Sequence, residues 1–404
     1  MTEPATVSGK LLWTPDGSPT ELDDYAAFLN ATSGVDWAGD YHKLWQWSVD
    51  KKGAFWSSLW DWHGVIGEKG ARYLIDEDQM PGASFFPDAS VNYAENMLAD
   101  ADGSPALIAY GEDGRCTRLS RAELKTKVMA LAGWIHSQGV GRGDRVAAYL
   151  PNGEHALIAM LATAALGGIF SSCSPDFGVR GVLDRFGQVE PRFFIAADGY
   201  RFKGRAFDRR PQLAEILDGL PTVERCLVIP YLEAQPDLAG LRDCQLLSDW
   251  LTREAVPELS CVRLPFDHPL YIMYSSGTTR VPKAIVHGAG GTLLQHIKEH
   301  RLHTNLTPDD RLFYFTTCGW MMWNWLVTGL ASGATLLLYD GNPFRNEGRI
   351  LFDYADAEGM TLFGTSAKFI DALSKAGLEP KNSHDLSTLR LMTSTGSPLV
   401  PESF

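Results

Sequence analysis

The segment from Tyr274 to Lys283, Tyr-Ser-Ser-Gly-Thr-Thr-Arg-Val-Pro-Lys, carries the residue types best suited to chemistry in this chain. Its small and hydroxylated residues offer hydroxyl and backbone N–H donors, and they are Ser275, Ser276, Gly277, Thr278 and Thr279. Donors for oxygen atoms, a glycine that lets backbone come close, and a lysine charge are the groups that hold a polyphosphate. The segment therefore predicts a phosphate-binding loop.

A Walker A loop, Gly-x-x-x-x-Gly-Lys-Ser/Thr, is the main alternative for such a segment. Gly277 and Lys283 have the right spacing for it. However, Pro282 stands in place of the second glycine and Ala284 in place of the hydroxyl that binds magnesium. The Walker A interpretation is therefore excluded, and the flanking apolar runs at 271–274 and 284–286 instead predict a strand, a loop and a second strand.

The string Tyr-Ser-Ser-Gly-Thr-Thr-x-x-Pro-Lys-Ala-Ile-Val-His resembles the phosphate-loop signature of the adenylate-forming acyl-CoA synthetases, and within them the enzymes that act on acetoacetate. Segments 80–96, 317–324 and 394–399 share this likeness, so it extends over nearly the whole chain. The resemblance implies a ligase that joins acetoacetate to CoA through acetoacetyl-AMP and releases AMP and pyrophosphate. Its implied cofactors are ATP and Mg²⁺, with CoA as co-substrate.

The resemblance also implies roles for individual residues. The loop residues and Lys283 would bind the β- and γ-phosphates of ATP, with Thr278 and Lys283 taking part in catalysis. The other implied sites are an adenine-contacting turn at Thr395, Gly396, Ser397 and Pro398, an acyl pocket bounded by Trp320 and Met321, and CoA phosphate contacts from Arg201 and Arg205. The structural alternatives are an exposed turn, ordinary core and a solvated charge run. The arginine spacing has one residue more than the family pattern.

Two departures from the family pattern keep alternatives open. Arg280 stands where the family has glycine, and a positive φ there would cost a residue with a Cβ about 1–2 kcal/mol. The chain also stops at Phe404, before the family's ribose-binding Asp and its mobile domain with a catalytic lysine, so C-terminal truncation is expected. The alternatives are a non-catalytic nucleotide-binding fragment and a ligase for acetate or another short acid.

Composition narrows the class of protein. The 404 residues carry a formal net charge of −13, which argues against nucleic acid or anionic membrane as a partner. The small-molecule substrates acetoacetate, ATP and CoA are implied by the resemblance alone. The six cysteines are scattered without a Cys-x-x-Cys pair, which favours reduced thiols in the cytoplasm over a disulfide frame or zinc site. No signal peptide is visible, and the longest apolar run, 156–170, is shorter than the roughly 20 residues of a membrane span.

The pattern of elements predicts an α/β fold with stacked, doubly wound and mostly parallel sheets. We expect an aromatic-rich helical segment at 1–100 packed on the body, a first α/β subdomain at 101–265 and a second at 266–404. Strands are predicted at 145–150, 192–196, 225–229, 312–316, 335–339, 361–363 and 389–393, and helices at 154–166, 292–303, 346–357 and 366–376, with a capping box at Ser120 and Glu123 opening a further helix that Gly139 ends. Ligands of such sheets bind beyond the carboxyl ends of strands, which is where each candidate segment falls.

The motif His296-x-x-Glu299-His300 matches a zinc-peptidase pattern and would place both histidines on one helical face. No third ligand motif accompanies it, and its helix directly follows the phosphate loop. We therefore expect a surface helix and no metal site there.

Overall fold

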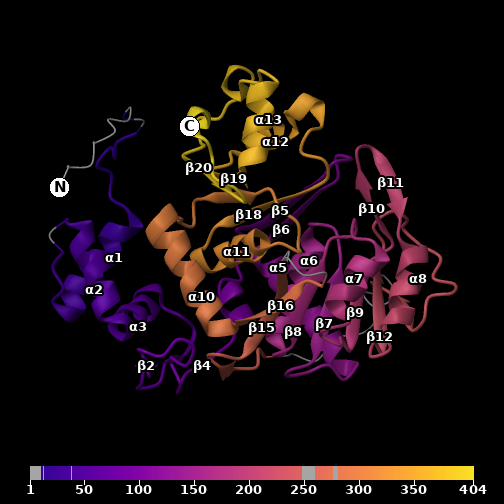
Figure 1. Ribbon diagram of the computed structural model, residues 1–404, viewed down its shortest axis with the longest axis horizontal. Helices are drawn as coiled ribbons and strands as arrows, with labels where there is room; N and C mark the ends of the chain where they lie inside the picture. The colour runs from indigo at the N-terminus through magenta and orange to yellow at the C-terminus, as the bar shows by residue number, and fades with distance from the viewer. Residues whose placement is uncertain (1–10, 12, 38, 248–259, 276–280) are drawn as a thin grey trace, which may run out of the picture.

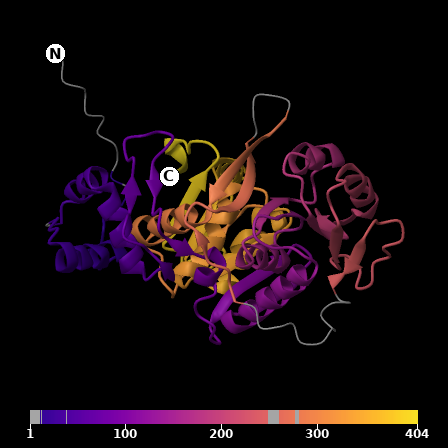
Figure 2. The same cartoon turned by 90° about the horizontal axis from the view of Figure 1, so that it is seen from below.

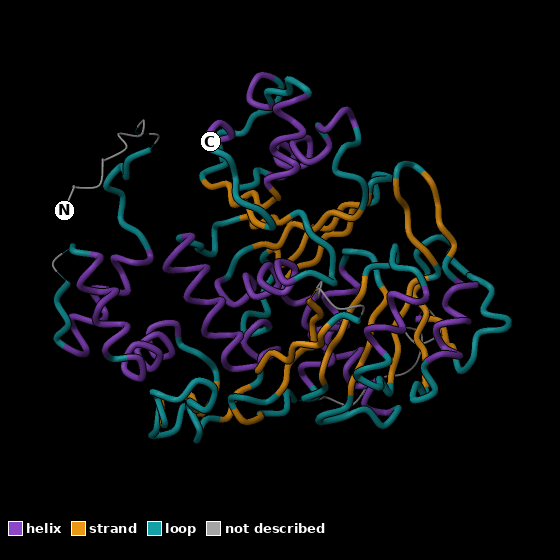
Figure 3. The backbone as a smooth tube through the Cα atoms, in the orientation of Figure 1, coloured by secondary structure: helices purple, strands orange, loops and turns teal. Residues whose placement is uncertain are grey.

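In the computed structural model, which describes residues 11, 13–37, 39–247, 260–275 and 281–404, the chain forms an N-terminal group of helices beside two large sheets covered by helices (Figure 1). The predicted α/β class with stacked, mostly parallel sheets is confirmed. Helices, strands and loops alternate through the body, whereas the described residues within 21–63 form three helices and no strand (Figure 3).

The N-terminal region consists of α1 (Glu21–Ser33), α2 (Tyr41–Asp50) and α3 (Lys52–His63). A capping box of Thr20 and Asp23 opens α1. The three helices enclose a small core of Tyr25, Leu29, Leu44 and Phe55, with several tryptophans packed against it. Arg301 fastens this core to the body, because its guanidinium pairs with Glu21 and lies 3.7 Å from the Trp62 ring centroid. The tryptophan-rich segment thus forms packed helices, as predicted.

The first sheet has seven strands in the described part of the chain, in the order β13–β12–β9–β7–β8–β15–β16. Neighbours are parallel except for the final pair, β15 and β16, which is antiparallel. Its strands are β7 (Arg145–Tyr149), β8 (Ile169–Cys173), β9 (Phe193–Ala197), β12 (Arg225–Ile229), β13 (Cys244–Leu246), β15 (Pro269–Ser275) and β16 (Lys283–Gly288).

The second sheet has six strands among the described residues, in the order β20–β19–β17–β18–β5–β6, and only β5 with β6 is antiparallel there. Its strands are β5 (Pro105–Gly111), β6 (Cys116–Ser120), β17 (Arg311–Tyr314), β18 (Thr335–Asp340), β19 (Leu362–Ser366) and β20 (Leu391–Thr395). The sheets do not follow the order of the chain: β5 and β6 precede the first sheet in sequence, and β15 and β16 follow position 265. The subdomain boundaries at 100 and 265 stay predictions. Residue 265 does not separate the two sheets, because each sheet contains strands from both sides of it.

Short strands complete the described fold. One small sheet joins β1 (Gly67–Glu68), β4 (Ser90–Val91) and β14 (Leu264–Pro265), and a second joins β2 (Leu74–Ile75) to β3 (Ser84–Phe85). A separate hairpin of β10 (Gly199–Phe202) and β11 (Arg205–Asp208) follows β9. In Figure 1 this hairpin stands at the side of the body opposite to the N-terminal helices.

Helices lie between the sheets and on both outer faces. Between them run α4 (Tyr93–Met97), α5 (Arg121–Ser137), α6 (Glu154–Ala165), α10 (Ala289–Ile297) and α11 (Met321–Thr328), in one large core. The outer face of the first sheet packs against α7 (Val179–Phe186) and α8 (Arg210–Gly219), and that of the second against α12 (Ile350–Glu358) and α13 (Ala367–Lys375). The capping box predicted at Ser120 and Glu123 opens α5. None of the described helices has both the length and the apolar character that crossing a membrane demands.

The carboxyl ends of the two sheets meet along a line that we call the seam, defined by two bonded contacts. After β7, Asn152 donates its backbone N–H to Asp340 at the end of β18, with 3.0 Å between nitrogen and oxygen. The Ser172 hydroxyl in β8 donates to the carbonyl of Cys318, which follows β17, at 2.6 Å. The seam is therefore where parallel strands of both sheets end, the position favoured for ligands.

Candidate active site

The phosphate-loop prediction falls on the antiparallel end of the first sheet. Ser275, the last residue of β15, pairs with Lys283, the first residue of β16, so the two strands form the predicted strand–loop–strand unit. Lys283 is exposed, and the strand pair extends away from the rest of the sheet (Figure 2). Ser276, Gly277, Thr278, Thr279 and Arg280 lie outside the described residues.

The acyl-pocket prediction falls on the turn between β17 and α11. Trp320 occupies the N-cap position of α11 and is 60% exposed, and Met321 begins the helix with 38% exposure. Cys318 anchors the turn from below, because its thiol donates to the Leu150 carbonyl at 3.1 Å and its own carbonyl accepts the Ser172 bond. Trp320 and Met321 thus stand at the open side of the seam, next to Gly319.

A small cavity connects these two regions. It lies between β8, β15 and α11, and its lining includes Ser172, Met273, Gly319 and Asn324. Its internal space is about 10 Å³, close to the room needed for one water molecule. Met273 comes two residues before the end of β15, and Gly319 comes directly before Trp320. The structure therefore brings the root of the phosphate-loop strands and the turn before the predicted acyl wall to one cavity, but Trp320 and Met321 themselves do not line it.

The adenine-turn prediction falls at the end of β20. Thr395 pairs with Ser366 at the end of β19, and Gly396 has φ of 91°, which glycine adopts without strain. Thr395, Gly396, Ser397 and Pro398 are all exposed. Ser366 caps α13 through a bond from the Phe369 N–H. The turn is at the carboxyl end of the second sheet, two strands from β17, and does not line the cavity.

The two predicted CoA arginines occupy the β10–β11 hairpin but are not brought together. Arg201 pairs with Ala206 and Phe202 pairs with Arg205 across the hairpin, so the two arginine side chains lie on opposite faces of the ribbon. Arg201 forms an ion pair with Asp113 at 3.1 Å, and Arg205 is exposed. One bound phosphate therefore cannot meet both guanidinium groups on the same face.

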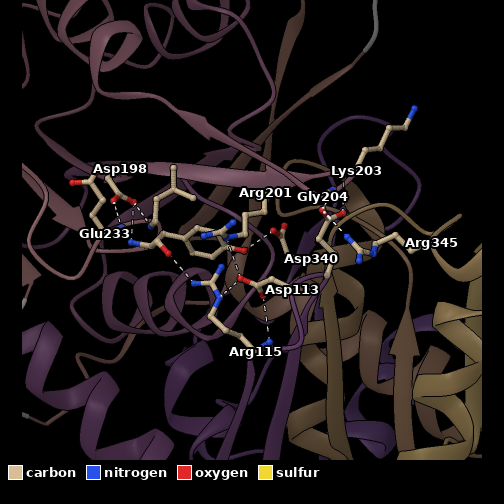
Figure 4. A network of polar contacts seen from close by, with 12 residues as sticks. Asp113, Arg115, Asp198, Arg201, Lys203, Gly204, Glu233, Asp340 and Arg345 are labelled. Carbon is tan, nitrogen blue, oxygen red and sulfur yellow. Dashed lines mark hydrogen bonds and ion pairs between the residues drawn. The ribbon is translucent and has the colours of Figure 1, made fainter.

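Sequence reasoning missed a polar network at the turn between β5 and β6 (Figure 4). The Glu112 side chain is only 1% exposed and accepts backbone N–H bonds from Lys203 at 3.0 Å, Gly204 at 2.6 Å and Asn342 at 2.9 Å. Arg345 adds an ion pair at 3.5 Å. This one carboxylate fastens the tip of the β10–β11 hairpin to the second sheet. The available signal was its place directly after a strand, where ligand and linking groups gather.

Beside that network lies a second cavity of about 160 Å³, lined by residues that include Arg115, Asn152, His155 and Asp340. Arg115 bonds Asp113 at 2.9 Å and stacks 4.0 Å from the centre of the Tyr231 ring. Asp340 accepts from Tyr231 Oη at 2.8 Å, yet burial raises the pKa of its carboxyl to about 6. The polar side chains around this cavity bond mainly to one another. Because Tyr231 and Asn152 follow strands of the first sheet and Asp340 ends a strand of the second, these bonds hold the two sheets together.

The surface helix predicted at the histidine motif is wrong, because both histidines are buried in the core between the sheets. His296 is in α10, its Nδ1 is 2.7 Å from the Thr328 hydroxyl, and His300 is fully buried in a π-helical turn over Lys298–His303. The single helix predicted over 292–303 is therefore divided, with α-helix to Ile297 and π-helix beyond. Burial first, and His296 second, hold the pKa of His300 well below its usual range. Among the described residues, no three carboxylate, thiol or imidazole groups lie together as metal ligands would.

Comparison with known proteins identifies the family. Residues 97–404 match the family described as AMP-binding enzyme, and residues 41–97 match the acetyl-coenzyme A synthetase N-terminus. The chain is 51% identical to the acetoacetyl-coenzyme A synthetase of Rhizobium meliloti (strain 1021), over 97% of this chain and 61% of that protein. It is 38% identical to the malonamoyl-CoA synthetase of Penicillium aethiopicum, over 90% of this chain and 54% of that protein.

A solved structure agrees. The acetoacetyl-CoA synthetase from Streptomyces lividans superposes with a TM-score of 0.89 at 42% identity, over 95% of this chain and 59% of that one. The chain thus spans about three fifths of the length of these two acetoacetyl-CoA synthetases. Because the family match covers most of the residues and the fold agrees, the chain belongs to the AMP-binding enzymes, within which it is similar to acetoacetyl-CoA synthetases.

Proposed function

We propose that the enzyme that carries these 404 residues is an ATP-dependent acetoacetate–CoA ligase. The observation that carries the proposal is the 51% identity to an acetoacetyl-coenzyme A synthetase over 97% of the chain. The geometry supports it, since Ser275 and Lys283 flank the candidate phosphate loop and β15 also lines the small cavity beside Gly319. The six cysteines are free thiols, which fits the cytoplasm as the site of action.

The reaction has two steps. A carboxylate oxygen of acetoacetate attacks the α-phosphorus of ATP, an O–P bond forms, and the bond to the β-phosphate oxygen breaks, which releases pyrophosphate. The CoA thiol then loses its proton and attacks the acyl carbon, and AMP leaves with the former carboxylate oxygen. ATP enters as its magnesium complex, in which phosphate oxygens are the metal's ligands.

No protein nucleophile is required, so the protein contributes positioning and charge stabilisation. Lys283 supplies the positive charge at the β- and γ-phosphates, with Ser275, Ser276, Gly277, Thr278 and Thr279 as donors. The turn from Thr395 to Pro398 holds adenine, and Trp320 with Met321 bounds the acyl group. Arg201 and Arg205 remain our candidates for CoA phosphates, and their opposite faces imply contacts with two different phosphate groups.

Lys283→Ala tests the proposal. Acetoacetate-dependent exchange of labelled pyrophosphate into ATP should fall by about 100-fold or more, the usual cost of removing one stabilising group from a charged transition state. The matched control is Lys43→Ala, because Lys43 is an exposed lysine on α2, away from the seam. Exchange that is unchanged in Lys283→Ala would remove the loop from the mechanism. Absence of exchange in the unaltered enzyme would favour a non-catalytic nucleotide-binding protein.

A second candidate substrate class comes from a specific relative. The chain is also 38% identical to a protein named malonamoyl-CoA synthetase, so its relatives are named for more than one acyl group. Measuring kcat/KM with acetoacetate, malonamate and acetate decides between them. A preference for acetate would return the assignment to an acetyl-CoA synthetase, the description attached to the matched N-terminal family.

A further inference from the structure

In the small cavity between β8, β15 and α11, the side-chain amide of Asn324 has only weak partners. Asn324 is 3% exposed, and its amide nitrogen lies 3.4 Å from the Met273 sulfur and 3.4 Å from the Trp320 carbonyl oxygen. A thioether is a weak acceptor, and 3.4 Å is longer than a usual N–H···O bond. The Ser172 hydroxyl, by contrast, donates a 2.6 Å bond to Cys318. Asn324 therefore keeps hydrogen-bonding capacity that its protein neighbours use poorly.

Its position relates this amide to the acyl end of the site. Asn324 lies one helical turn after Trp320 on α11, so it is inside the cavity while Trp320 stands at the open side. The space of about 10 Å³ holds one group the size of a water molecule. A carbonyl oxygen fits that space and needs a donor, whereas a longer alkyl chain does not fit.

We propose that the Asn324 amide donates a hydrogen bond to the carbonyl oxygen on the third carbon of a 3-oxo acid, which makes Asn324 a specificity-determining residue. This inference rests on the proposed function. The acyl groups in the names of two relatives, acetoacetyl and malonamoyl, end in a methyl and an amino group but share a carbonyl at that carbon. A donor at this point recognises what the two acids have in common.

Butyrate is the matched probe, because it has the carbon chain of acetoacetate without the oxo group. The unaltered enzyme should have a higher kcat/KM for acetoacetate than for butyrate. Asn324→Leu, which keeps the side-chain size but removes the donor, should lower the acetoacetate-to-butyrate ratio by about 10- to 100-fold, the effect of one buried polar group losing its partner. The fall should come from acetoacetate, with butyrate activity retained or raised.

Retained butyrate activity also shows that the variant is folded. Should Asn324→Leu lose both activities, Asn324→Ser, which is smaller and keeps a donor, should hold most of the preference for acetoacetate. Gln295→Leu is the matched control, since it removes an exposed amide from the neighbouring helix α10 and should leave the ratio unchanged. An unaltered ratio in Asn324→Leu overturns the inference while the ligase assignment stands. An unaltered enzyme that activates neither acid overturns the proposed function and this inference with it.

Discussion

Glu112 offers the sharpest test of how the seam is built. Its carboxylate accepts three backbone N–H bonds and an ion pair, and it joins three segments far apart in the sequence: the β5–β6 turn, the β10–β11 hairpin and the loop after β18. The two hairpin bonds go to Lys203 and Gly204, at the tip between the strands that carry Arg201 and Arg205. Replacing Glu112 with glutamine should therefore release that tip.

The size of the effect follows from the bonds. Glutamine keeps one carbonyl oxygen but places an NH₂ group against at least one backbone N–H, and Arg345 loses its charged partner. Hydrogen bonds to a charged group contribute about 1.5–3 kcal/mol each, so losing one such bond together with the ion pair should cost about 3–5 kcal/mol. We expect the substitution to loosen the hairpin tip without unfolding the first sheet, because the first sheet has a hydrophobic core of its own.

Two assays separate structure from function. Amide hydrogen exchange at Lys203 and Gly204 should be faster by about 100-fold or more in Glu112→Gln, since 3 kcal/mol exceeds two powers of ten. In the ligase assay KM for CoA should rise, whereas pyrophosphate exchange, which does not use CoA, should change little. The control is Glu77→Gln, because Glu77 is an exposed glutamate between β2 and β3.

Each readout has its own refuting result. Unchanged exchange protection at Lys203 and Gly204 would show that Glu112 does not hold the tip. Lost protection with an unchanged KM for CoA would keep the clamp and remove the hairpin from CoA binding. Equal losses of pyrophosphate exchange and thioester formation would place the effect on the whole seam.

Two further predictions concern pH. Burial raises the pKa of the Asp340 carboxyl to about 6, so the folded protein binds this proton more tightly than the unfolded chain. The contribution of Asp340 to stability therefore falls as pH rises from 4 to 7, by up to about 3 kcal/mol. In urea unfolding, Asp340→Asn should gain stability relative to the original protein over that range, and a constant difference between the two would contradict the raised pKa. Burial lowers the pKa of His300, so the contribution of its neutral imidazole to stability is present above pH 6.5 and is lost as pH falls below that value. His300→Phe, which keeps a ring edge-on to Trp325, should accordingly lose less stability than the original protein between pH 7 and pH 5, and an equal loss would be evidence against a neutral buried imidazole.

Local signals in the sequence were sufficient for most elements. The capping box of Ser120 and Glu123 opens α5 where the spacing predicts it. The strand predicted at 225–229 has those bounds in β12, and the one predicted at 145–150 ends one residue earlier in β7. These successes share a cause, because caps and apolar periodicity act over a few residues.

Other features depended on contacts that local patterns do not contain. The pairing of β18 with β5, which sets Leu336 beside Leu107, joins residues more than two hundred positions apart. A lone glutamate after a strand gives no sign that a distant hairpin will supply two backbone donors to it and the loop after β18 a third. The π-helical turn from Lys298 to His303 continues the apolar pattern of α10, so periodicity alone predicted one helix.

The distribution of strands between the sheets, which local patterns did not predict, brings elements of both sheets together at their carboxyl edges. β5 belongs to the second sheet, and the turn after it crosses to the first, where Arg115 Nη1 donates to the Tyr231 carbonyl at 2.8 Å. β15 and β16 belong to the first sheet, and β15 shares the small cavity with Gly319 and Asn324, which follow β17 of the second. Each sheet thus contributes an element to the other's carboxyl edge. On the proposed function, groups from both sheets would hold a substrate in the seam. A substitution that loosens the junction of the sheets, as at Glu112, should then alter binding even where no substituted atom contacts the substrate.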